Sequence, residues 1–295
     1  MTYGNVGKNM QNEEFVKISV VIPSFNQGEF IERTLCSVFD QNYPNIEIIV
    51  VDGGSSDSSV EIIRKYEKHL SYWHSRKDSG QSNAINFGFR KATGRFKTWL
   101  NSDDVFMPGA LYKVNEFIHC YPDCRWFSGN TLWIDRNDRI LRAGKTEQRG
   151  RFFRSRILPA VGPSAFARED LLEQYGLLRE DFHYMMDTEM WYRWSNAGEW
   201  SIKLPIYVWG LRLHENAKMS GHNFSGSPMA DPNHPKRIQR RKEAEVLDGL
   251  IGPHTGMDKI MFYCNKICDG SIWSRFTDHS LSGKIWMDVF WGDTK

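Results

Sequence analysis

The sequence predicts an α/β fold with a mostly parallel β-sheet flanked by helices, and three observations support it. From residue 17 to about 100, short apolar runs alternate with amphipathic stretches of helical periodicity. The apolar runs are continuous, as in strands that helices bury on both faces. The chain has 295 residues, of which 40% are hydrophobic, enough for one large domain with a packed core.

The strands and helices of the first hundred residues follow from this alternation. The run IEIIVV is apolar at every position except Glu47, whereas EFIERTLCSVF carries apolar residues near i, i+4 and i+7, which is typical of a helix. The predicted strands are 17–22, 46–51, 71–75 and 96–100, and the predicted helices are 29–39, 58–70 and 84–92.

The second half of the chain has a different pattern. Between residues 125 and 167, short strands with turns (RWFSGN, TLWID, RILRAG) predict an antiparallel or mixed extension of the sheet. Two helices should end at Gly176 and Gly198, because glycine is the usual residue just past a helix end. The runs SIKLP and IYVWGLRLH are expected to return as strands.

Past residue 214 the composition changes again. A stretch rich in Gly, Pro, Ser and Asn indicates a loop, and KRIQRRKEAEVLDGLI indicates a basic helix. An aromatic tail follows, with Trp273, Trp286, Phe290 and Trp291. We therefore expect an N-terminal tail (1–16), a main domain (17–214) and a C-terminal loop and helical extension (215–295).

Composition excludes several classes of protein. The formal charge of +2 argues against nucleic acid as a partner. No apolar segment has the length of a signal peptide or a transmembrane helix, which predicts a cytoplasmic protein. The i,i+4 pairs Cys120/Cys124 and Cys264/Cys268 could form a structural zinc site, but reduced, partly buried thiols fit helical sequence better.

Polar residues gather where the predicted parallel strands end. Because ligands of such sheets bind beyond the carboxyl ends of the strands, these loops should form one site. The neighbouring acids Asp103 and Asp104 are suited to a divalent cation, Mg²⁺ or Mn²⁺, shared with substrate phosphates. The four loops are 23–27, 52–57, 78–81 and 101–104.

Each candidate acid also has a purely structural interpretation. Asp52 could belong to a turn before a helix capped by Ser56 or Asp57. The pair Asp103 and Asp104 could complement the dipole of a helix that starts near Pro108. Asp187 could be the N-cap of the helix that follows it, and these alternatives stay open at this point.

The loops taken together resemble a known family. The segments VVIPSFNQGEFIERTLCSVFDQNYPNIEIIVVDGGSSDSS and DSGQSNAINFGFRKATGRFKTWLNSDD resemble the nucleotide-binding half of family 2 glycosyltransferases with the GT-A fold. MDTEMWYRW and LRLHENAKMS resemble that family's catalytic-base and late histidine motifs. The resemblance covers about residues 17–220. It implies a GT-A catalytic domain over 17–214, with a nucleotide-sugar half (17–105) and an acceptor half (106–214).

The resemblance also implies roles for individual residues. Asp52 would contact the nucleobase, Asp103 the ribose, and Asp104 the metal, whose shell His214 would complete. Gly53 stands where the family often has a second acid, and Asn83 where it commonly has an Asp. The remaining donor contacts are assigned to Pro23, Phe25, Asp78 and Gln81.

For the acceptor side, the resemblance implies that Asp187 is the general base, with Glu189 as the second choice. A single base without a carboxylate nucleophile favours one in-line displacement with inversion at the sugar carbon. The predicted function is a metal-dependent transfer from a nucleotide-diphosphate sugar, UDP-linked, to a glycan or lipid-linked acceptor in surface polysaccharide synthesis.

The alternative function is a catalytically silent scaffold subunit that binds a sugar nucleotide. PSFNQGEF supplies neither the G-x-G-x-x-G of a dinucleotide-binding oxidoreductase nor the Gly-rich phosphate loop of a nucleotidyltransferase. The basic helix could meet an anionic surface, either the inner face of a membrane or a lipid-diphosphate acceptor, although a solvated helix face is the simpler explanation of its basic residues. The aromatic tail could take part in a peripheral membrane contact, pack back onto the catalytic domain or form a dimer contact.

Overall fold

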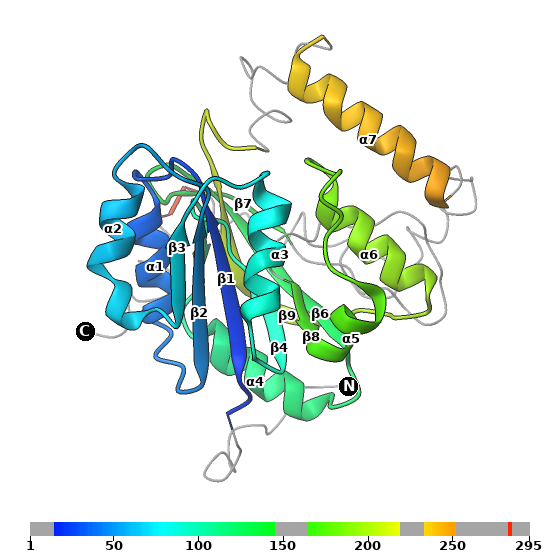
Figure 1. Cartoon of the computed structure of the whole chain (residues 1–295). Coiled ribbons are helices and arrows are strands. Elements are labelled where there is room, and N and C mark those ends of the chain that lie inside the picture. The colour runs from blue at the N-terminus through cyan, green and yellow to red at the C-terminus, as the bar shows by residue number, and fades with distance from the viewer. Residues whose placement is uncertain (1–14, 145–164, 219–232, 252–282, 285–295) are drawn as a thin grey trace.

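The computed structural model describes residues 15–144, 165–218, 233–251 and 283–284 (Figure 1). Their core is a nine-stranded mixed sheet in the order β3-β2-β1-β4-β8-β6-β9-β5, with β7 paired to β6. Helix α3 packs against β1 and β2 on one face, while α1 and α4 pack near β5 and β9 on the other. The predicted α/β class with helices on both faces is confirmed.

The first half of the sheet is parallel, as predicted. Strand β1 lies between β2 and β4, and β2 also pairs with β3, all in parallel register. The strands are β1 (Ile18–Ser24), β2 (Ile46–Asp52), β3 (Tyr72–Ser75) and β4 (Phe96–Trp99). The helical segments between them are α1 (Ile31–Phe39), α2 (Ser59–Lys65), the 3₁₀ turn η1 (Glu67–His69) and α3 (Gln81–Lys91).

The second half is mixed and differs from the prediction in detail. One strand contains both RWFSGN and TLWID, and a second strand contains both SIKLP and IYVWGLRLH. Register shifts near Gly129 and Asn130 let these two strands stay paired on either side of Pro205. A short strand after Asp104, which the sequence did not predict, pairs antiparallel with β9. The strands are β5 (Val105–Phe106), β6 (Trp126–Asp135), β7 (Ile140–Gly144), β8 (Ala165–Arg168) and β9 (Ile202–Leu213).

The later helices end where the sequence predicted. Gly176 and Gly198 follow α5 and α6 with φ of +79° and +91°, a backbone region that glycine enters without steric cost. The helices are α4 (Ala110–Cys120), α5 (Glu169–Tyr175), α6 (Met186–Asn196) and α7 (Pro235–Ile251).

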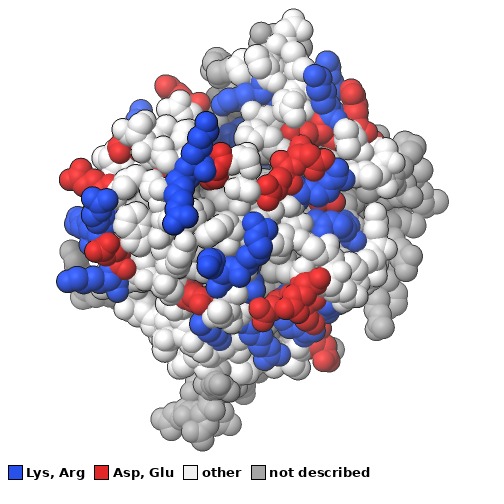
Figure 2. All heavy atoms as spheres, in the orientation of Figure 1, with Lys and Arg blue, Asp and Glu red and all other residues white. Residues whose placement is uncertain are grey.

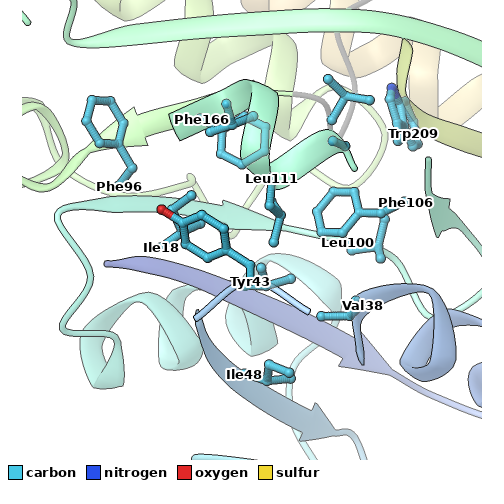
Figure 3. Packing of buried hydrophobic residues seen from close by; sticks show 14 of the residues in the cluster. Ile18, Val38, Tyr43, Ile48, Phe96, Leu100, Phe106, Leu111, Phe166 and Trp209 are labelled. Carbon is cyan, nitrogen blue, oxygen red and sulfur yellow. The ribbon is translucent and has the colours of Figure 1, made fainter. Parts of the chain in front are cut away.

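Alternate residues of β1 serve two hydrophobic clusters, because successive side chains of a strand point to opposite faces. Ile18, Val20 and Ile22 pack with α1 and α4, whereas Val21 packs with α3, α5 and α6. Figure 3 shows the first cluster, in which Ile18, Phe96 and Phe106 from three strands meet Leu111 of α4. The sheet is therefore a rigid support for the loops at its edge.

Several predictions concern residues at the periphery of the fold. The basic helix is confirmed as α7, while the aromatic tail, Cys264 and Cys268 lie outside the described residues. The buried Cys124 thiol donates to the carbonyl of Trp126 at 3.1 Å, and burial raises its pKa to about 11, as expected of a reduced thiol. None of the helices in the described ranges is long and apolar enough to cross a bilayer. On the face in Figure 2, the described Lys and Arg side chains are interspersed with Asp and Glu.

Candidate active site

A single cavity of about 780 Å³ lies at the carboxyl ends of β1, β2, β3 and β4. Each of the four predicted loops contributes to its wall, so the structure brings them together as the parallel topology requires. The opposite wall comes from the start of α6, from β6 and β9, and from one residue of α7. The predicted site residues that line it are Pro23, Phe25, Asp78, Gln81, Asp103 and Asp187, whereas Asp52, Asp104, Glu189 and His214 do not.

The first loops provide an apolar platform and a carboxylate. Phe25 is 60% exposed at the cavity, although large apolar side chains are usually buried, which leaves its ring free to stack on a planar ligand. Asp78 accepts a hydrogen bond from the backbone N–H of Gly80 at 2.8 Å. A Cβ at Gly53 would lie 2.9 Å from Oδ2 of Asp78. The glycine that replaces the family's second acid is therefore the residue that makes room for Asp78.

Asp52 is completely buried at the end of β2. Its carboxylate accepts hydrogen bonds from the backbone N–H groups of Gly54 and Ser55 and from the hydroxyls of Ser55 and Ser75. In this conformation Asp52 shapes the 53–55 turn, as its structural interpretation predicted. Protein donors bind both carboxylate oxygens of Asp52. Its contact with a nucleobase, which the resemblance implies, therefore stays a prediction.

The neighbouring acids Asp103 and Asp104 have different surroundings. Asp103 lines the cavity, and its Oδ2 lies 3.1 Å from Nε2 of His214. Asp104 is only 2% exposed, and its carboxylate accepts from the backbone N–H of Arg212 and from Nδ2 of Asn101, both at 2.9 Å. Burial and the charge of Asp103 raise the pKa of Asp104 well above its ordinary value.

In this conformation the structure disfavours Asp104 as the metal ligand, and that assignment stays a prediction. Asp104 directly precedes β5, whose antiparallel pairing with β9 turns this carboxylate toward Arg212 and away from the cavity. The helix-dipole alternative stays a prediction; in the chain, β5 lies between the two acids and α4, which begins at Ala110. Asp103 and His214 are the pair that the structure brings together, and no group of three or more His, Cys, Asp or Glu side chains in the described ranges is placed to hold a metal.

Asp187 lies in the first turn of α6, at the cavity wall. It is not the N-cap, which is Met185; its Oδ1 accepts instead from the backbone N–H of Thr188 at 2.6 Å and from the Thr188 hydroxyl at 3.1 Å. Burial raises the pKa of Asp187 to about 6, and Lys218 partly opposes that shift. A carboxylate with such a pKa is well suited to take a proton near neutral pH.

Glu189, the second choice for the base, has a structural role. Its two carboxylate oxygens accept hydrogen bonds from Nε and Nη2 of Arg193, at 3.0 and 2.9 Å, which makes a bidentate ion pair within α6. The same guanidinium donates to the carbonyls of Tyr175, Gly176 and Leu177 at the end of α5. Glu189 is buried and does not line the cavity, so the structure disfavours it as a base.

Sequence reasoning missed several cavity residues. Lys218 donates from Nζ to Oε1 of Gln81 at 2.7 Å, and burial lowers its pKa to about 8. It belongs to the LRLHENAKMS segment, so the motif contained the signal. Arg240 comes from the basic helix α7 and borders the cavity, whereas the sequence predicted for that helix a contact with an anionic surface or a solvated face. Other missed residues of the cavity wall include Lys77, Arg142, Trp99, Trp191 and Trp209.

A hydrogen-bond chain joins these parts of the wall. Lys218 donates to Gln81, Gln81 donates to Oδ1 of Asn101 at 2.7 Å, and Asn101 donates to Asp104. Asn83 instead donates a hydrogen bond to Glu180 at 2.9 Å and does not line the cavity. This agrees with the assignment of the donor contacts in this loop to Asp78 and Gln81.

Comparison with known proteins gives one family match. The model of "Glycosyl transferase family 2" matches residues 19–176, just over half of the chain. An uncharacterised glycosyltransferase of Rickettsia typhi is 25% identical over 194 residues, which are 62% of this chain and 60% of that protein. The putative teichuronic acid biosynthesis glycosyltransferase TuaG of Bacillus subtilis is 38% identical over 106 residues, 34% of this chain and 41% of that protein. This chain thus spans well under two thirds of either relative.

Two solved structures have a similar fold. TarS residues 1–349 of Staphylococcus aureus, in complex with UDP-GlcNAc, matches with a TM-score of 0.55 at 19% identity over 93% of this chain and 78% of that one. The mannosyltransferase PcManGT of Pyrobaculum calidifontis, in complex with GDP-Man and Mn²⁺, gives a TM-score of 0.57 at 16% identity over 88% and 72%. At these identities the likeness establishes the fold, the GT-A type expected from the sequence.

Proposed function

The chain belongs to glycosyl transferase family 2, and we propose that it is an inverting enzyme that transfers a sugar from a UDP-linked donor. One observation carries the proposal: Asp103, paired with His214, and Asp187, with its raised pKa, border the same cavity. The first pair suits the diphosphate of a donor, and the second carboxylate suits the hydroxyl of an acceptor.

The donor is assigned to the side of the cavity built by β1 to β4. Phe25 and Pro23 offer apolar surface to a nucleobase, and Asp78 and Gln81 offer polar groups to the nucleoside. Lys77 adds a positive charge at the same wall. The complex of the similar TarS with UDP-GlcNAc supports a UDP-linked donor, while that of PcManGT makes a GDP-linked sugar the competitor to test.

We assign a divalent cation, Mn²⁺ or Mg²⁺, to Asp103 and His214. One carboxylate and one imidazole are few protein ligands, which fits an ion whose other positions come from phosphate oxygens and water. When bound, such an ion neutralises the charge that grows on the departing diphosphate. Arg212 would hold this site in place, because its Nε donates to the carbonyl of Asp103 at 2.8 Å.

Asp187 is assigned as the general base. The acceptor oxygen attacks the anomeric carbon, the bond from that carbon to the phosphate oxygen breaks, and Asp187 takes the hydroxyl proton. Such proton transfer typically contributes about 10² to 10⁴ in rate. Because attack and departure occur on opposite sides of the carbon in one step, the configuration inverts.

The acceptor is proposed to be a glycan or lipid-linked glycan of a surface polysaccharide. Trp99 and Trp191, whose rings stack with centroids 6.5 Å apart, add apolar groups to the cavity wall, as is typical of ligand sites. The name of the relative TuaG supports polysaccharide synthesis. A cytoplasmic location with a peripheral membrane contact through α7 stays a prediction; Arg237, Arg241 and Lys242 are its exposed basic residues.

The test is a thermal-shift screen of UDP- and GDP-linked sugars with and without Mn²⁺, followed by turnover with acceptor extracts. A donor at one hundred times its dissociation constant should stabilise the protein by about 2.7 kcal/mol. Asp187→Asn should bind the donor like the wild type but lose turnover. If the wild type binds the donor and transfers it to no acceptor extract, the scaffold interpretation replaces the enzyme.

A further inference from the structure

The segment that leads into α6 is tied to α7 by one buried carboxylate. Glu243 of α7 is only 4% exposed. Its Oε1 accepts the backbone N–H of His183 at 2.9 Å, and its Oε2 accepts those of Tyr184 at 2.7 Å and Met185 at 2.9 Å. Helix α6, which carries Asp187, has no side-chain cap of its own. A residue about 60 positions later in the chain therefore supplies acceptors to the three N–H groups that precede this helix.

The position of this carboxylate has an electrostatic basis. Backbone N–H groups at a helix N-terminus carry partial positive charge, so a carboxylate there is favourable. Hydrogen bonds to an ionised acceptor are also stronger than those between neutral groups. The cavity-lining Tyr184 and Met185 lie within this bonded segment, two and three positions before Asp187.

Packing of α7 holds Glu243 at this point. Leu247, one helical turn further along, is buried in the same hydrophobic cluster as Met186 and Met190 of α6. Gln239, one turn earlier, donates to Oε1 of Glu243 at 3.0 Å. In the view of Figure 1, α7 lies above α6 and the two helices run in a similar direction.

We propose that Glu243 is a positioning residue for the catalytic base, and that α7 is thereby an integral part of the active site. The inference rests on the proposed function, since it assigns to Glu243 the task of fixing the first turn of α6, where Asp187 must meet the acceptor hydroxyl. Misplacing a reacting group by about 1 Å can lower a rate on the order of 10²-fold.

The experiment compares Glu243→Gln with Glu245→Gln, an exposed glutamate of the same helix. Glutamine keeps the size of the side chain but leaves one acceptor oxygen for three N–H donors. We expect Glu243→Gln to lower kcat about 10- to 100-fold per UDP-binding site, with donor KM within about 2-fold of the wild type. Counting sites by calorimetric titration with UDP removes the effect of any unfolded fraction. Glu245→Gln should match the wild type.

Amide hydrogen exchange of residues 183–185 provides a second readout that needs no turnover. Glu243→Gln should exchange faster there, and Glu243→Asp, which keeps the charge, should recover part of the protection and of kcat. The proposal is overturned if Glu243→Gln keeps the wild-type kcat per UDP-binding site, so that any loss of activity only follows the loss of UDP-binding sites. If the wild type itself transfers no sugar, the proposed function fails, and unchanged exchange in Glu243→Gln would separately overturn the anchoring.

Discussion

Replacing Asp103 and Asp104 one at a time by asparagine separates the metal ligand from the structural acid. Two donors point at the Asp104 carboxylate, the N–H of Arg212 and Nδ2 of Asn101. An asparagine keeps one acceptor oxygen and must turn its NH₂ group toward the other donor. Leaving one buried group unsatisfied costs about 1–3 kcal/mol. Because burial and Asp103 raise the pKa of Asp104, removing its charge offsets part of this cost, and Tm should fall by about 2–5 °C.

Asp103→Asn should behave in the opposite way. Its side chain lies at the cavity and approaches only His214, so Tm should change by no more than about 2 °C. The stabilisation by UDP that depends on Mn²⁺ should disappear, because one of the two protein ligands is lost. Asp104→Asn should keep that stabilisation.

The assay is thermal unfolding of both variants with UDP, with Mn²⁺ and with both together. Asp123→Asn is the control, because Asp123 is an exposed aspartate remote in sequence from both acids. If Asp104→Asn abolishes the Mn²⁺-dependent shift while Asp103→Asn retains it, the carboxylate that faces the cavity is not the metal ligand and the reasoning is refuted.

Four further predictions concern the site. Since the base must be deprotonated and the pKa of Asp187 is raised to about 6, kcat/KM should fall as the pH is lowered through 6; a flat profile from pH 5 to 8 contradicts this assignment. The raised pKa also means that ionised Asp187 opposes folding above pH 6, so Asp187→Asn should unfold at a higher temperature at pH 7.5, a gain that vanishes near pH 4. Gly53→Asp, whose Cβ would lie 2.9 Å from Asp78, should weaken UDP binding at least about 10-fold in calorimetry, whereas Gly249→Ala, with open space around it, should not. Glu189→Gln, which breaks a buried ion pair, should lower Tm but keep kcat per folded molecule within about 3-fold; loss of turnover at unchanged Tm would restore Glu189 as the base.

Local patterns predicted the parts of this fold that depend on local structure. Strand β2 is apolar except at Glu47 and Asp52 because helices cover both faces of the sheet, and most of that property is visible in IEIIVV. The shared edge of the four loops follows from parallel topology alone. By contrast, β5 is only two residues long and exists because β9 pairs with it, so the segment itself carries no signal.

The same distinction explains the errors at the site. Which of two adjacent acids faces a cavity depends on the partner of the following strand, and that partner, β9, is about one hundred residues away in the sequence. The contribution of Arg240 depends on how α7 docks, and a basic helix on its own is equally compatible with solvent, a membrane or a neighbouring domain. Residue type predicted the chemistry here, and tertiary pairing decided which residue performs it.

The end of β9 accounts for why both acids matter although only one faces the cavity. The backbone N–H of Arg212 binds the Asp104 carboxylate, while its side chain binds the Asp103 carbonyl, so the two acids are fixed to one residue from opposite directions. His214, two positions further, then reaches Asp103, and Lys218 reaches Gln81. The anchor at Asp104 and the pairing of the same strand end with β6 together set the spacing between Asp103 and His214. A buried acid thus contributes to the geometry of the proposed metal pair, and it does so through the backbone.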